Sequence, residues 1–419
     1  MQGIIEYLVS LNLPLLTEGT ARFLVLLVVA SIVAVVAPAS LIILTWLERK
    51  IIARIQDRIG PNRAGPFGLL QAVADMIKMF TKEDITPARA DRIVYNIAPG
   101  LAVFSSVMSF AVIPFAPGFV GTRLNVGLLY IVAVGGLGTL AILMAGWSSN
   151  NKYSLLGAFR SVAMLLTYEI PMVMMLVIVA MAAGSMSLAD IVDAQRSMWY
   201  AVSMPVVFLV FFFAGIAEVG RSPFDLIEAE SEIIAGFHTE YSGIKFGMFM
   251  IGEYVHMFAL SFFSAVLFFG GWHIPFMDVT ALPAPWAAII GLIVLLVKVF
   301  FFVFVMMWFR GTLPRFRIDQ LLDFGWKFLV PLSLVLLIGV AFVVKLFSPG
   351  SSAGIPVPPG PLSGLGIAGE VVGLLVVNLA IAGLAMAVVS ALARRSRNKV
   401  LRAISAVEPP AAVTAQSKP

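Results

Sequence analysis

Long apolar runs alternate with shorter polar segments along most of this chain. Nine runs are about 20 residues long, which at about 1.5 Å per helical residue is enough to cross a hydrocarbon layer of roughly 30 Å. None has the period of two that a membrane-spanning β-strand needs. The pattern therefore predicts an all-α, polytopic membrane helix bundle of about nine transmembrane helices, at 21–47, 97–116, 126–147, 161–184, 201–217, 248–270, 286–309, 328–347 and 366–392.

Composition supports lipid as the main solvent and limits the chemistry. Of the 419 residues, 60% are hydrophobic and only 12% are charged, whereas soluble domains have roughly 25% charged residues. The chain has no cysteine, which excludes disulfides and cysteine-ligated iron–sulfur clusters. Its three histidines are scattered, so we expect no metal site and no redox centre within this chain.

The basic residues predict the orientation in the membrane. Most of the 28 lysines and arginines fall in alternate connecting segments and in the C-terminal tail, and such residues stay on the cytoplasmic side. We therefore expect a multi-pass protein of the bacterial cell membrane, with its N-terminus outside and its C-terminus in the cytoplasm. The formal charge of +5 then reflects topology, and no motif for nucleic-acid binding accompanies it.

Breaks in composition predict four regions. Residues 1–347 should form one membrane-embedded domain, because the hydrophobic runs follow one another with short connections. Residues 348–365 are rich in proline, glycine and serine and predict an external linker. An extra transmembrane helix should follow at 366–393, and the tail at 394–419 should be a disordered cytoplasmic segment.

The first cytoplasmic segment contains an amphipathic stretch. Two Gly-Pro pairs break the chain at 60–67, and from 67 to 80 apolar residues recur at helical spacing. This predicts a short helix lying on the cytoplasmic side of the membrane surface. It is either a simple anchor or the border of a gap that admits a hydrophobic molecule from the bilayer, and the pattern does not choose between them.

An acidic segment at 217–241 opposes the basic bias of cytoplasmic loops. A single arginine, Arg221, stands among six carboxylates: Glu218, Asp225, Glu228, Glu230, Glu232 and Glu240. One interpretation is a solvated acidic loop. The interleaved apolar residues favour the other, in which buried and coupled carboxylates share and relay protons.

Ionisable residues inside the predicted spans are the second polar signal. They are Glu169, Glu218, Glu253 and Lys298, and such residues are costly in lipid and commonly mark proton pathways. Residues near a helix end can reach the headgroups, as Glu218 and Glu253 could. Lys298 has apolar neighbours on both sides, so we expect it to face a carboxylate, either Glu169 or Glu253, in a relay or in a purely structural ion pair.

Five separated motifs resemble one known family. They are ERK, RIGPNRAGPFGLLQ and MFTKE within 48–83, TYEIP at 167–171, AEVGRSPFDLIEAESEIIAGFHTEY at 217–241, GEYVHM at 252–257, and WFRGTLPRFRIDQLLDFGWK at 308–327. Together they resemble the family of the H subunit of proton-pumping NADH–quinone oxidoreductase, respiratory complex I. The resemblance covers residues 20–347, and the ninth predicted helix departs from the eight-helix pattern of that family.

The resemblance implies a function and a set of site residues. It implies a quinone substrate, with flavin and iron–sulfur clusters in partner subunits of the peripheral arm, beside small and antiporter-like membrane subunits. The quinone chamber would be lined by Glu48, Arg49, Arg58, Phe67, Phe224 and Arg310. An acidic funnel would contain Asp225, Glu228, Glu230 and Glu232. A charged path would continue through Glu169, Glu218, Glu253 and Lys298.

Two other functions share some of these features. A membrane-bound hydrogenase-type complex has a related membrane subunit, and a stand-alone ion transporter would also carry intramembrane charges. The GPNRAGPFG and PRFRIDQ segments favour the quinone enzyme over the hydrogenase. We find no internal repeat in the sequence, which disfavours the transporter.

Overall fold

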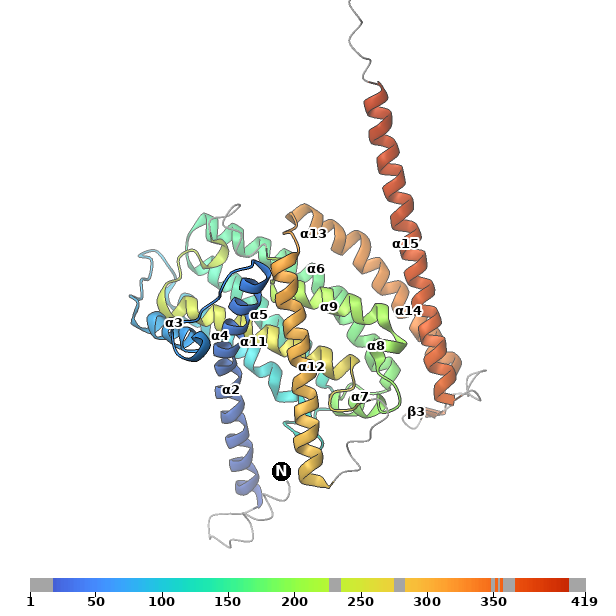
Figure 1. Ribbon diagram of the computed structural model, residues 1–419, viewed down its shortest axis with the longest axis horizontal. Coiled ribbons are helices and arrows are strands. Elements are labelled where there is room, and N and C mark those ends of the chain that lie inside the picture. Colours follow the sequence, from blue (N-terminus) through green and yellow to red (C-terminus); the bar gives the residue numbers. More distant parts are fainter. Residues whose placement is uncertain are drawn as a thin grey trace, which may run out of the picture.

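The computed structural model describes residues 18–225, 235–274, 283–347, 351–352, 355–356 and 366–406. Helices form nearly all of this part of the chain (Figure 1). The longer ones are α2 (Glu18–Ile55), α4 (Arg92–Met108), α5 (Gly127–Ser148), α6 (Lys152–Ala183), α9 (Pro205–Val219), α11 (Gly243–Phe268), α12 (Ala284–Thr312), α14 (Val330–Phe347) and α15 (Gly366–Ala406). The shorter ones are η1 (Pro66–Gly68), α3 (Leu70–Thr81), η2 (Ser109–Val112), α7 (Leu188–Ala194), α8 (Tyr200–Ser203), η3 (Gly236–His238), α13 (Ile318–Phe324) and η5 (Gly325–Leu329).

Strands are confined to two small antiparallel pairs in the described part of the chain. Strand β1 (Pro114–Ala116) pairs with β2 (Phe119–Val120), and β3 (Ser351–Ser352) pairs with β4 (Ile355–Pro356). The second pair falls within the stretch that the sequence predicts to be a linker. Neither pair contributes to the bundle's architecture, so the all-α prediction is confirmed.

Eight helices among the described residues are long and apolar enough to cross a membrane. The predicted fifth crossing at 201–217 corresponds to α8 and the shorter apolar helix α9. Pro205 lies in the first turn of α9, and Gly220 follows its end in the left-handed conformation, with φ of 75°. Both are positions that these residue types favour, because proline fixes φ and glycine has no Cβ to clash.

The outer helices expose large apolar side chains. Val35 in α2 is 68% exposed, and Ile338 and Phe342 in α14 are 69% and 63% exposed. Water around so much apolar surface would be unfavourable by about 25 cal/mol per Å². The exposed residues therefore belong in the hydrocarbon of a bilayer.

The bundle is held together by successive helix contacts around α6 and α11. Helix α5 packs against α4 and α6, α11 packs against α4 and α12, and α14 packs against α6. The core between them contains Tyr168, Phe211 and Phe268, all buried. The Tyr168 hydroxyl donates a 3.0 Å hydrogen bond to the carbonyl of Leu321, which fixes the start of the last core crossing against α6.

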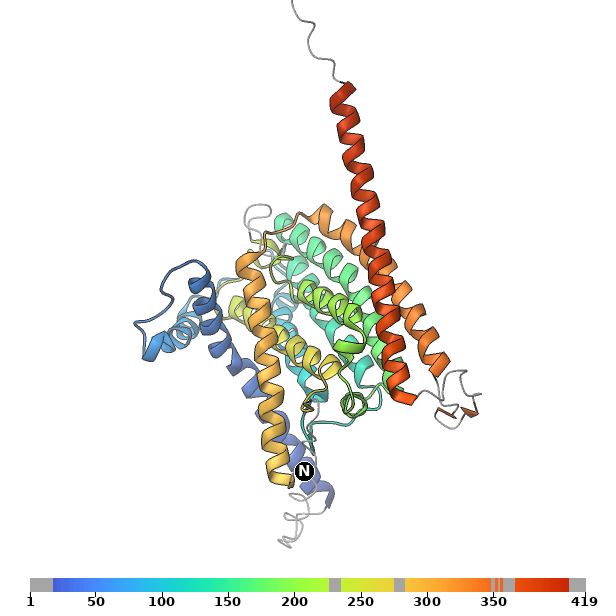
Figure 2. The ribbon, with the colours of Figure 1, turned by 45° about the vertical axis from the view of Figure 1, so that its right-hand side comes forward.

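Helix α2 continues eight residues beyond the predicted crossing and ends at Ile55. This extension keeps Glu48 and Arg49 in a helix instead of the predicted loop. The predicted amphipathic helix is confirmed as η1 and α3, which lie to the side of the bundle in Figures 1 and 2. Its wholly local apolar periodicity made it visible in the sequence.

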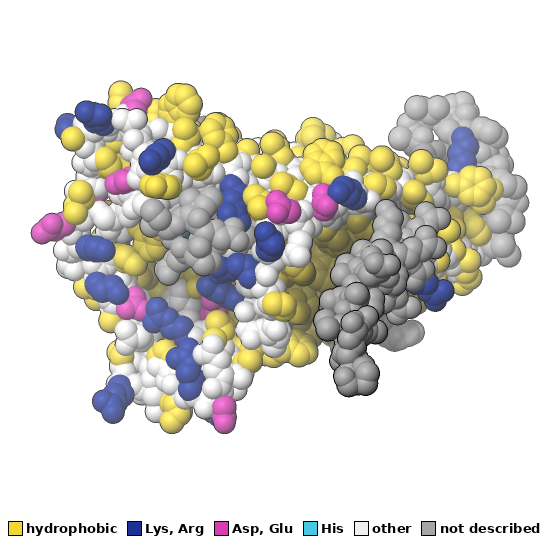
Figure 3. Space-filling view, turned by 90° about the horizontal axis from the view of Figure 1, so that it is seen from above, with side chains coloured by type: hydrophobic (Ala, Val, Ile, Leu, Met, Phe, Trp, Pro, Cys, Tyr) yellow, Lys and Arg dark blue, Asp and Glu magenta, His cyan; other side chains and the backbone are white. Residues whose placement is uncertain are grey.

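Basic side chains gather at one end of the bundle. The last turns of α2 and α12 carry Arg54 and Arg310, and both helices end at the upper side of Figure 1. Figure 3 shows lysine and arginine side chains collected on this face. The lower end of α2 and the upper end of α15 lie on opposite sides of the bundle (Figures 1 and 2).

Helix α15 lies at the edge of the bundle, where it packs against α14, α8 and α9. It runs to Ala406, past the predicted end of the extra transmembrane helix at 393. The added residues contain no glycine or proline and several good helix formers, so the helix has no local reason to end at the predicted boundary. Apart from this later helix end, the division of the chain into regions at 347, 365 and 393 remains a prediction.

Candidate functional site

Arg221 lies at the centre of the site. It follows Gly220, where the chain leaves α9, and only 3% of its side chain is exposed. Its Nη1 atom is 2.8 Å from Oε2 of Glu48 in α2, and its Nε atom is 2.7 Å from Oε1 of Glu253 in α11. One buried arginine therefore joins carboxylates from two helices that are far apart in the sequence.

Arg310 and Tyr254 complete what we call the arginine cluster: Glu48, Arg221, Glu253, Tyr254 and Arg310. Arg310 forms a second ion pair with Glu48, and the Arg221 guanidinium lies 4.1 Å from the centre of the Tyr254 ring. Burial by itself lowers the pKa of Arg221, but Glu253 and Glu48 outweigh it and hold that pKa above its ordinary value. Arg221 is therefore a permanent cation that keeps two carboxylates in the interior.

The segment after Arg221 begins the predicted acidic funnel. Phe224 is buried, with its ring centroid 5.3 Å from that of Tyr168. Nη2 of Arg315 donates a 2.9 Å hydrogen bond to Oδ2 of Asp225, whereas Oδ1 of Asp225 has no hydrogen-bond partner in the described part of the chain. The other predicted funnel residues lie outside the described residues: Glu228, Glu230 and Glu232.

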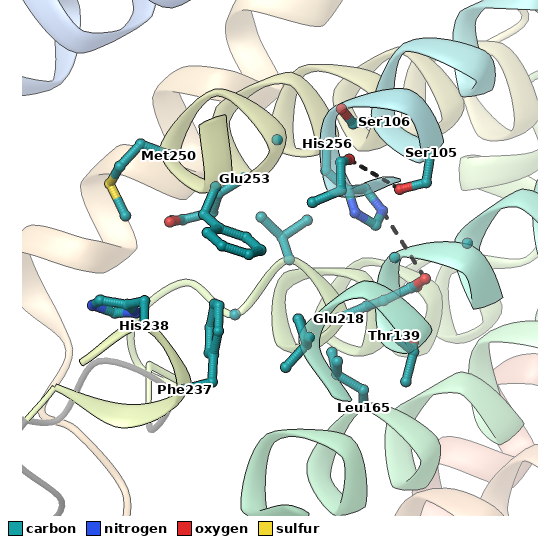
Figure 4. Close-up of a pocket in the computed structure, with 18 residues that line it drawn as sticks. Ser105, Ser106, Thr139, Leu165, Glu218, Phe237, His238, Met250, Glu253 and His256 are labelled. Atoms are coloured by element: carbon teal, nitrogen blue, oxygen red, sulfur yellow. Dashed lines mark hydrogen bonds and ion pairs between the residues drawn. The ribbon is translucent and has the colours of Figure 1, made fainter. Parts of the chain in front are cut away.

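A cavity of about 100 Å³ lies beside the arginine cluster (Figure 4). Glu218 from α9, Glu253 and His256 from α11, and His238 from η3 are among its lining residues, and Ser105 of α4 adds a hydroxyl. Nε2 of His256 lies 4.0 Å from Oε1 of Glu218. The volume is sufficient for several water molecules, and the lining offers the polar partners that they require.

Helix α5 leaves room for this cavity through its glycines. A Cβ atom at Gly135 would lie 3.2 Å from Oε1 of Glu218, and one at Gly138 would lie 3.2 Å from Oγ of Ser105. Both distances are shorter than ordinary van der Waals contact. The glycines thus let α5 approach without filling the space around the Glu218 carboxylate.

The histidine on the loop side of the cavity is neutral at pH 7. Burial lowers the pKa of His238 to about 4, although the charge of Asp225 opposes this shift. The ring also packs against Phe237 and Phe246, with centroids 5.1 and 5.2 Å away. A neutral imidazole has one donor and one acceptor nitrogen, so it can join a hydrogen-bonded chain in either direction.

Lys298 faces no carboxylate among the residues that the structure describes. Its Nζ atom donates hydrogen bonds of 2.7, 2.8 and 2.6 Å to the main-chain carbonyls of Phe269, Gly271 and His273, and it lies 4.8 Å from the centre of the Trp199 ring. The predicted pairing with Glu169 or Glu253 is therefore wrong. Carbonyl groups just beyond the C-terminal end of α11 satisfy all three ammonium protons instead, because the chain doubles back there.

Glu169 lies in α6, which packs against α9, the helix that carries Glu218. The Glu169 charge acts on Glu218 across the helix contact between α6 and α9. The structure thus brings three of the four predicted intramembrane charges, Glu253, Glu218 and Glu169, into one neighbourhood and separates Lys298 from them.

An apolar cavity of about 180 Å³ opens between α2, α3 and α11. Its lining includes Met76 and Met79 of α3, Ile251 of α11, and Arg49, which forms a 2.6 Å ion pair with Asp75. Tyr254 also lines this cavity, and its ring contacts Arg221. We call this space the side cavity; Tyr254 connects it to the arginine cluster.

Of the six predicted chamber residues, only Arg49 is among the residues that line the two cavities. Phe67 and Arg58 lie on the surface. Phe67 is 77% exposed, and its carbonyl accepts a 3.1 Å hydrogen bond from Nε1 of Trp46. Arg58 is exposed and donates a 2.7 Å hydrogen bond to Gln56. Neither is among the residues that line the two cavities described above.

Four residues of the site were not predicted from the sequence: Arg221, Tyr254, His238 and His256. Arg221 had a signal, because it is the single basic residue among six carboxylates at 217–241. His256 stands one helical turn after Glu253, which places both on the same helix face. The proximity of His256 to Glu218 could not be predicted, because their helices meet only in the folded bundle.

The family of this chain follows from comparison with known proteins. The family model described as NADH dehydrogenase matches residues 27–341. The chain belongs to this NADH dehydrogenase family. The family match ends within α14, so α15 lies outside the part that the NADH dehydrogenase model describes.

Relatives named as the H subunit of NADH-quinone oxidoreductase share nearly half of the aligned residues. The relative from Dehalococcoides mccartyi (strain CBDB1) is 50% identical over 307 residues, which cover 73% of this chain and 83% of that protein. The relative from Geobacillus kaustophilus is 48% identical over 302 residues, which cover 72% of this chain and 88% of that protein. The relative from Rhodospirillum centenum is 44% identical over 323 residues (77% and 95%).

Proposed function

We propose that this chain is the membrane subunit of a proton-translocating NADH–quinone oxidoreductase and that it forms the membrane-side wall of the quinone chamber. The names of its relatives support the enzyme class. The observation that carries the assignment of the chamber is the arginine cluster, where Glu48, Arg221 and Arg310 meet beside Tyr254. Tyr254 also lines an apolar cavity. Neither the hydrogenase-type complex nor the stand-alone transporter is supported by these names.

The side cavity provides a route for a lipid-soluble substrate. Met76, Met79 and Ile251 offer apolar contacts at the level of the amphipathic helix α3, where a quinone tail can leave the bilayer. The headgroup then approaches Tyr254 and the arginines behind it. The charges of Arg221 and Arg310 are balanced there by Glu48 and Glu253, so the cluster offers the headgroup guanidinium hydrogen-bond donors without a net positive charge.

Quinone reduction to quinol consumes two electrons and two protons. Arg221 does not supply the protons, because its pKa lies above the ordinary arginine value. We assign proton supply to the carboxylates around the cluster: Asp225, Glu228, Glu230 and Glu232 in the acidic loop, followed by Glu253, Glu218 and Glu169. Arg49 and Asp75 border the quinone path, and Phe224 borders the loop.

The remaining chemistry belongs to partner subunits. With no cysteine in the sequence, this chain has no ligands for cysteine-bound iron–sulfur clusters. We assign these clusters and the flavin to a peripheral arm that docks on the basic face, beside small and antiporter-like membrane subunits. That face, at the upper ends of α2 and α12, would be cytoplasmic under the rule for basic residues. The protein would then lie in the cell membrane of a bacterium, with its N-terminus outside the cell.

The test is purification from native membranes through a tag on the C-terminal end, followed by mass spectrometry and an NADH–quinone reductase assay. We expect a large assembly with flavin, iron–sulfur clusters and inhibitor-sensitive activity. Glu48→Gln should lower quinone reduction while NADH oxidation by a water-soluble acceptor persists. A lone chain without reductase activity would contradict the proposal.

A further inference from the structure

Two of the three histidines in this chain line the same internal cavity. Figure 4 shows His238 on one side and His256 on the other, with Glu253 between them. The third histidine, His273, lies at the opposite end of α11. Histidine is rare here and the cavity is small, so this placement calls for a chemical explanation.

The groups around His256 are suited to proton transfer. Among the cavity-lining residues, Glu218 and Glu253 are the carboxylates, His238 is the second imidazole, and α4 and α5 contribute the uncharged hydroxyls of Ser105 and Thr139. No lysine or arginine lines this cavity within the described part of the chain. Arg221 approaches it only through its ion pair with Glu253.

The gap between His256 and Glu218 fits a bridging water. Nε2 of His256 is 4.0 Å from Oε1 of Glu218, which is too long for a hydrogen bond but within reach of one bridging water. Glu253 precedes His256 by three residues on α11, so the two side chains share a face. The cavity volume of about 100 Å³ accommodates the water that such a chain needs.

We propose that His256 is a proton-relay residue that carries protons between water at Glu253 and the carboxylate of Glu218, and that His238 brings protons to the same cavity from the acidic loop. This inference rests on the proposed function and specifies the proton route next to the quinone chamber. It concerns two histidines to which neither the sequence motifs nor the names of the relatives give a role.

The transfer step balances. Neutral His256 accepts a proton from water at one ring nitrogen and releases the proton of the other nitrogen to the bridging water, which passes one of its own protons to the Glu218 carboxylate. The ring is left neutral in its other tautomer, and rotation or a second exchange with water resets it. One proton moves from the Glu253 side to Glu218, and no electron, bond to carbon or metal is involved.

The experiment compares three histidine variants in the complete enzyme: His238→Asn, His256→Asn and His273→Asn. Asparagine retains hydrogen-bonding groups but does not carry a proton at neutral pH. His273→Asn is the matched control, because its side chain lies outside the cavity and the Lys298 contact uses its main-chain carbonyl. The measurements are quinone reduction against pH, its rate in D2O relative to H2O, and protons pumped per NADH.

We expect His256→Asn to lower quinone reduction about tenfold, less than the roughly 10²–10⁴-fold contribution of a positioned acid–base group, because cavity water still carries some protons. The D2O effect should increase in this variant and in His238→Asn, and stay unchanged in His273→Asn. His256→Gln provides a second variant if the asparagine form does not assemble.

The outcomes separate this inference from the proposed function. Wild-type rate, pH profile and D2O effect in assembled His256→Asn or His256→Gln enzyme would overturn the relay while the oxidoreductase assignment stands. Absence of NADH–quinone activity in the wild-type assembly would instead overturn the proposed function. A slower enzyme with an unchanged D2O effect and pH profile would show that His256 only shapes the cavity, and this also contradicts the relay.

Discussion

Arg221 and Glu48 are 173 residues apart in the sequence, yet Nη1 of the arginine lies 2.8 Å from Oε2 of the carboxylate. Both side chains are almost completely buried. A buried ion pair contributes little net stability compared with apolar packing. The role of the Arg221–Glu48 pair in this protein is to hold the beginning of the acidic loop in place between α2 and α11.

Replacing Arg221 should be severely destabilising. Arg221→Met leaves Glu253 buried without its ion-pair partner and Glu48 with Arg310 alone. Breaking a buried ion pair costs about 3–5 kcal/mol. We expect loss of the assembled complex in native gels of membranes. The triple variant with Glu48→Gln and Glu253→Gln as well should recover assembly but not quinone reduction. Equal assembly of the single and triple variants would show that the loss of the complex in Arg221→Met does not come from the unpaired buried carboxylates.

Lys298 should stabilise the end of α11. Lys298→Met leaves the carbonyls of Phe269, Gly271 and His273 without their donor, and hydrogen bonds to a charged group are worth about 1.5–3 kcal/mol. We expect faster thermal inactivation of the purified enzyme, with an unchanged ratio of protons pumped to NADH oxidised. A lower ratio at normal thermal stability would support the relay role that the sequence predicts for Lys298.

A bulky residue in the side cavity should hinder quinone access. A Cβ atom at Gly247 would make ordinary contacts of 3.7 and 3.8 Å with Met79, so Gly247→Ala is tolerated and serves as the control. Gly247→Phe fills the space between α3 and α11, and its overpacking should raise the KM for quinone about tenfold, equivalent to about 1.4 kcal/mol. Steady-state kinetics with a long-tailed quinone measure this change. An unchanged KM in Gly247→Phe would place the quinone route elsewhere.

His238 should make the loop sensitive to acid. Its pKa falls from 6.5 to about 4 on folding because the ring is buried. The unfolded chain therefore binds more protons between these values, and folding stability rises with pH across that interval. The stabilising effect of a neutral, buried ring is complete above pH 6.5 and is lost as the pH falls toward 4.

The His238→Asn variant tests this dependence. Its thermal inactivation temperature should decrease less than that of the wild type between pH 6.5 and pH 4, because asparagine does not titrate. The comparison needs both enzymes at matched ionic strength. Parallel curves for the two enzymes would contradict the assignment of the acid sensitivity to His238.

Features that depend on local chain properties can be predicted from the sequence alone. Apolar runs of span length predicted the bundle, and helical periodicity predicted α3, because both depend on contacts with lipid or water within one segment. Helix ends were less certain: α2 and α15 continue past their predicted boundaries, since polar residues such as Glu48 and Arg394 are compatible with a helix. The motifs also predicted the family.

Which charged side chains meet in the interior depends on how the helices pack. Glu48, Arg221, Glu253 and Arg310 come from four separate segments, and no spacing along the chain shows that they share one buried cluster. The same limit explains the wrong partner predicted for Lys298, because main-chain carbonyls carry no sequence signature. Burial makes these pairings specific: a charge removed from water must find its partner nearby, and only the packing of the helices determines which group is near.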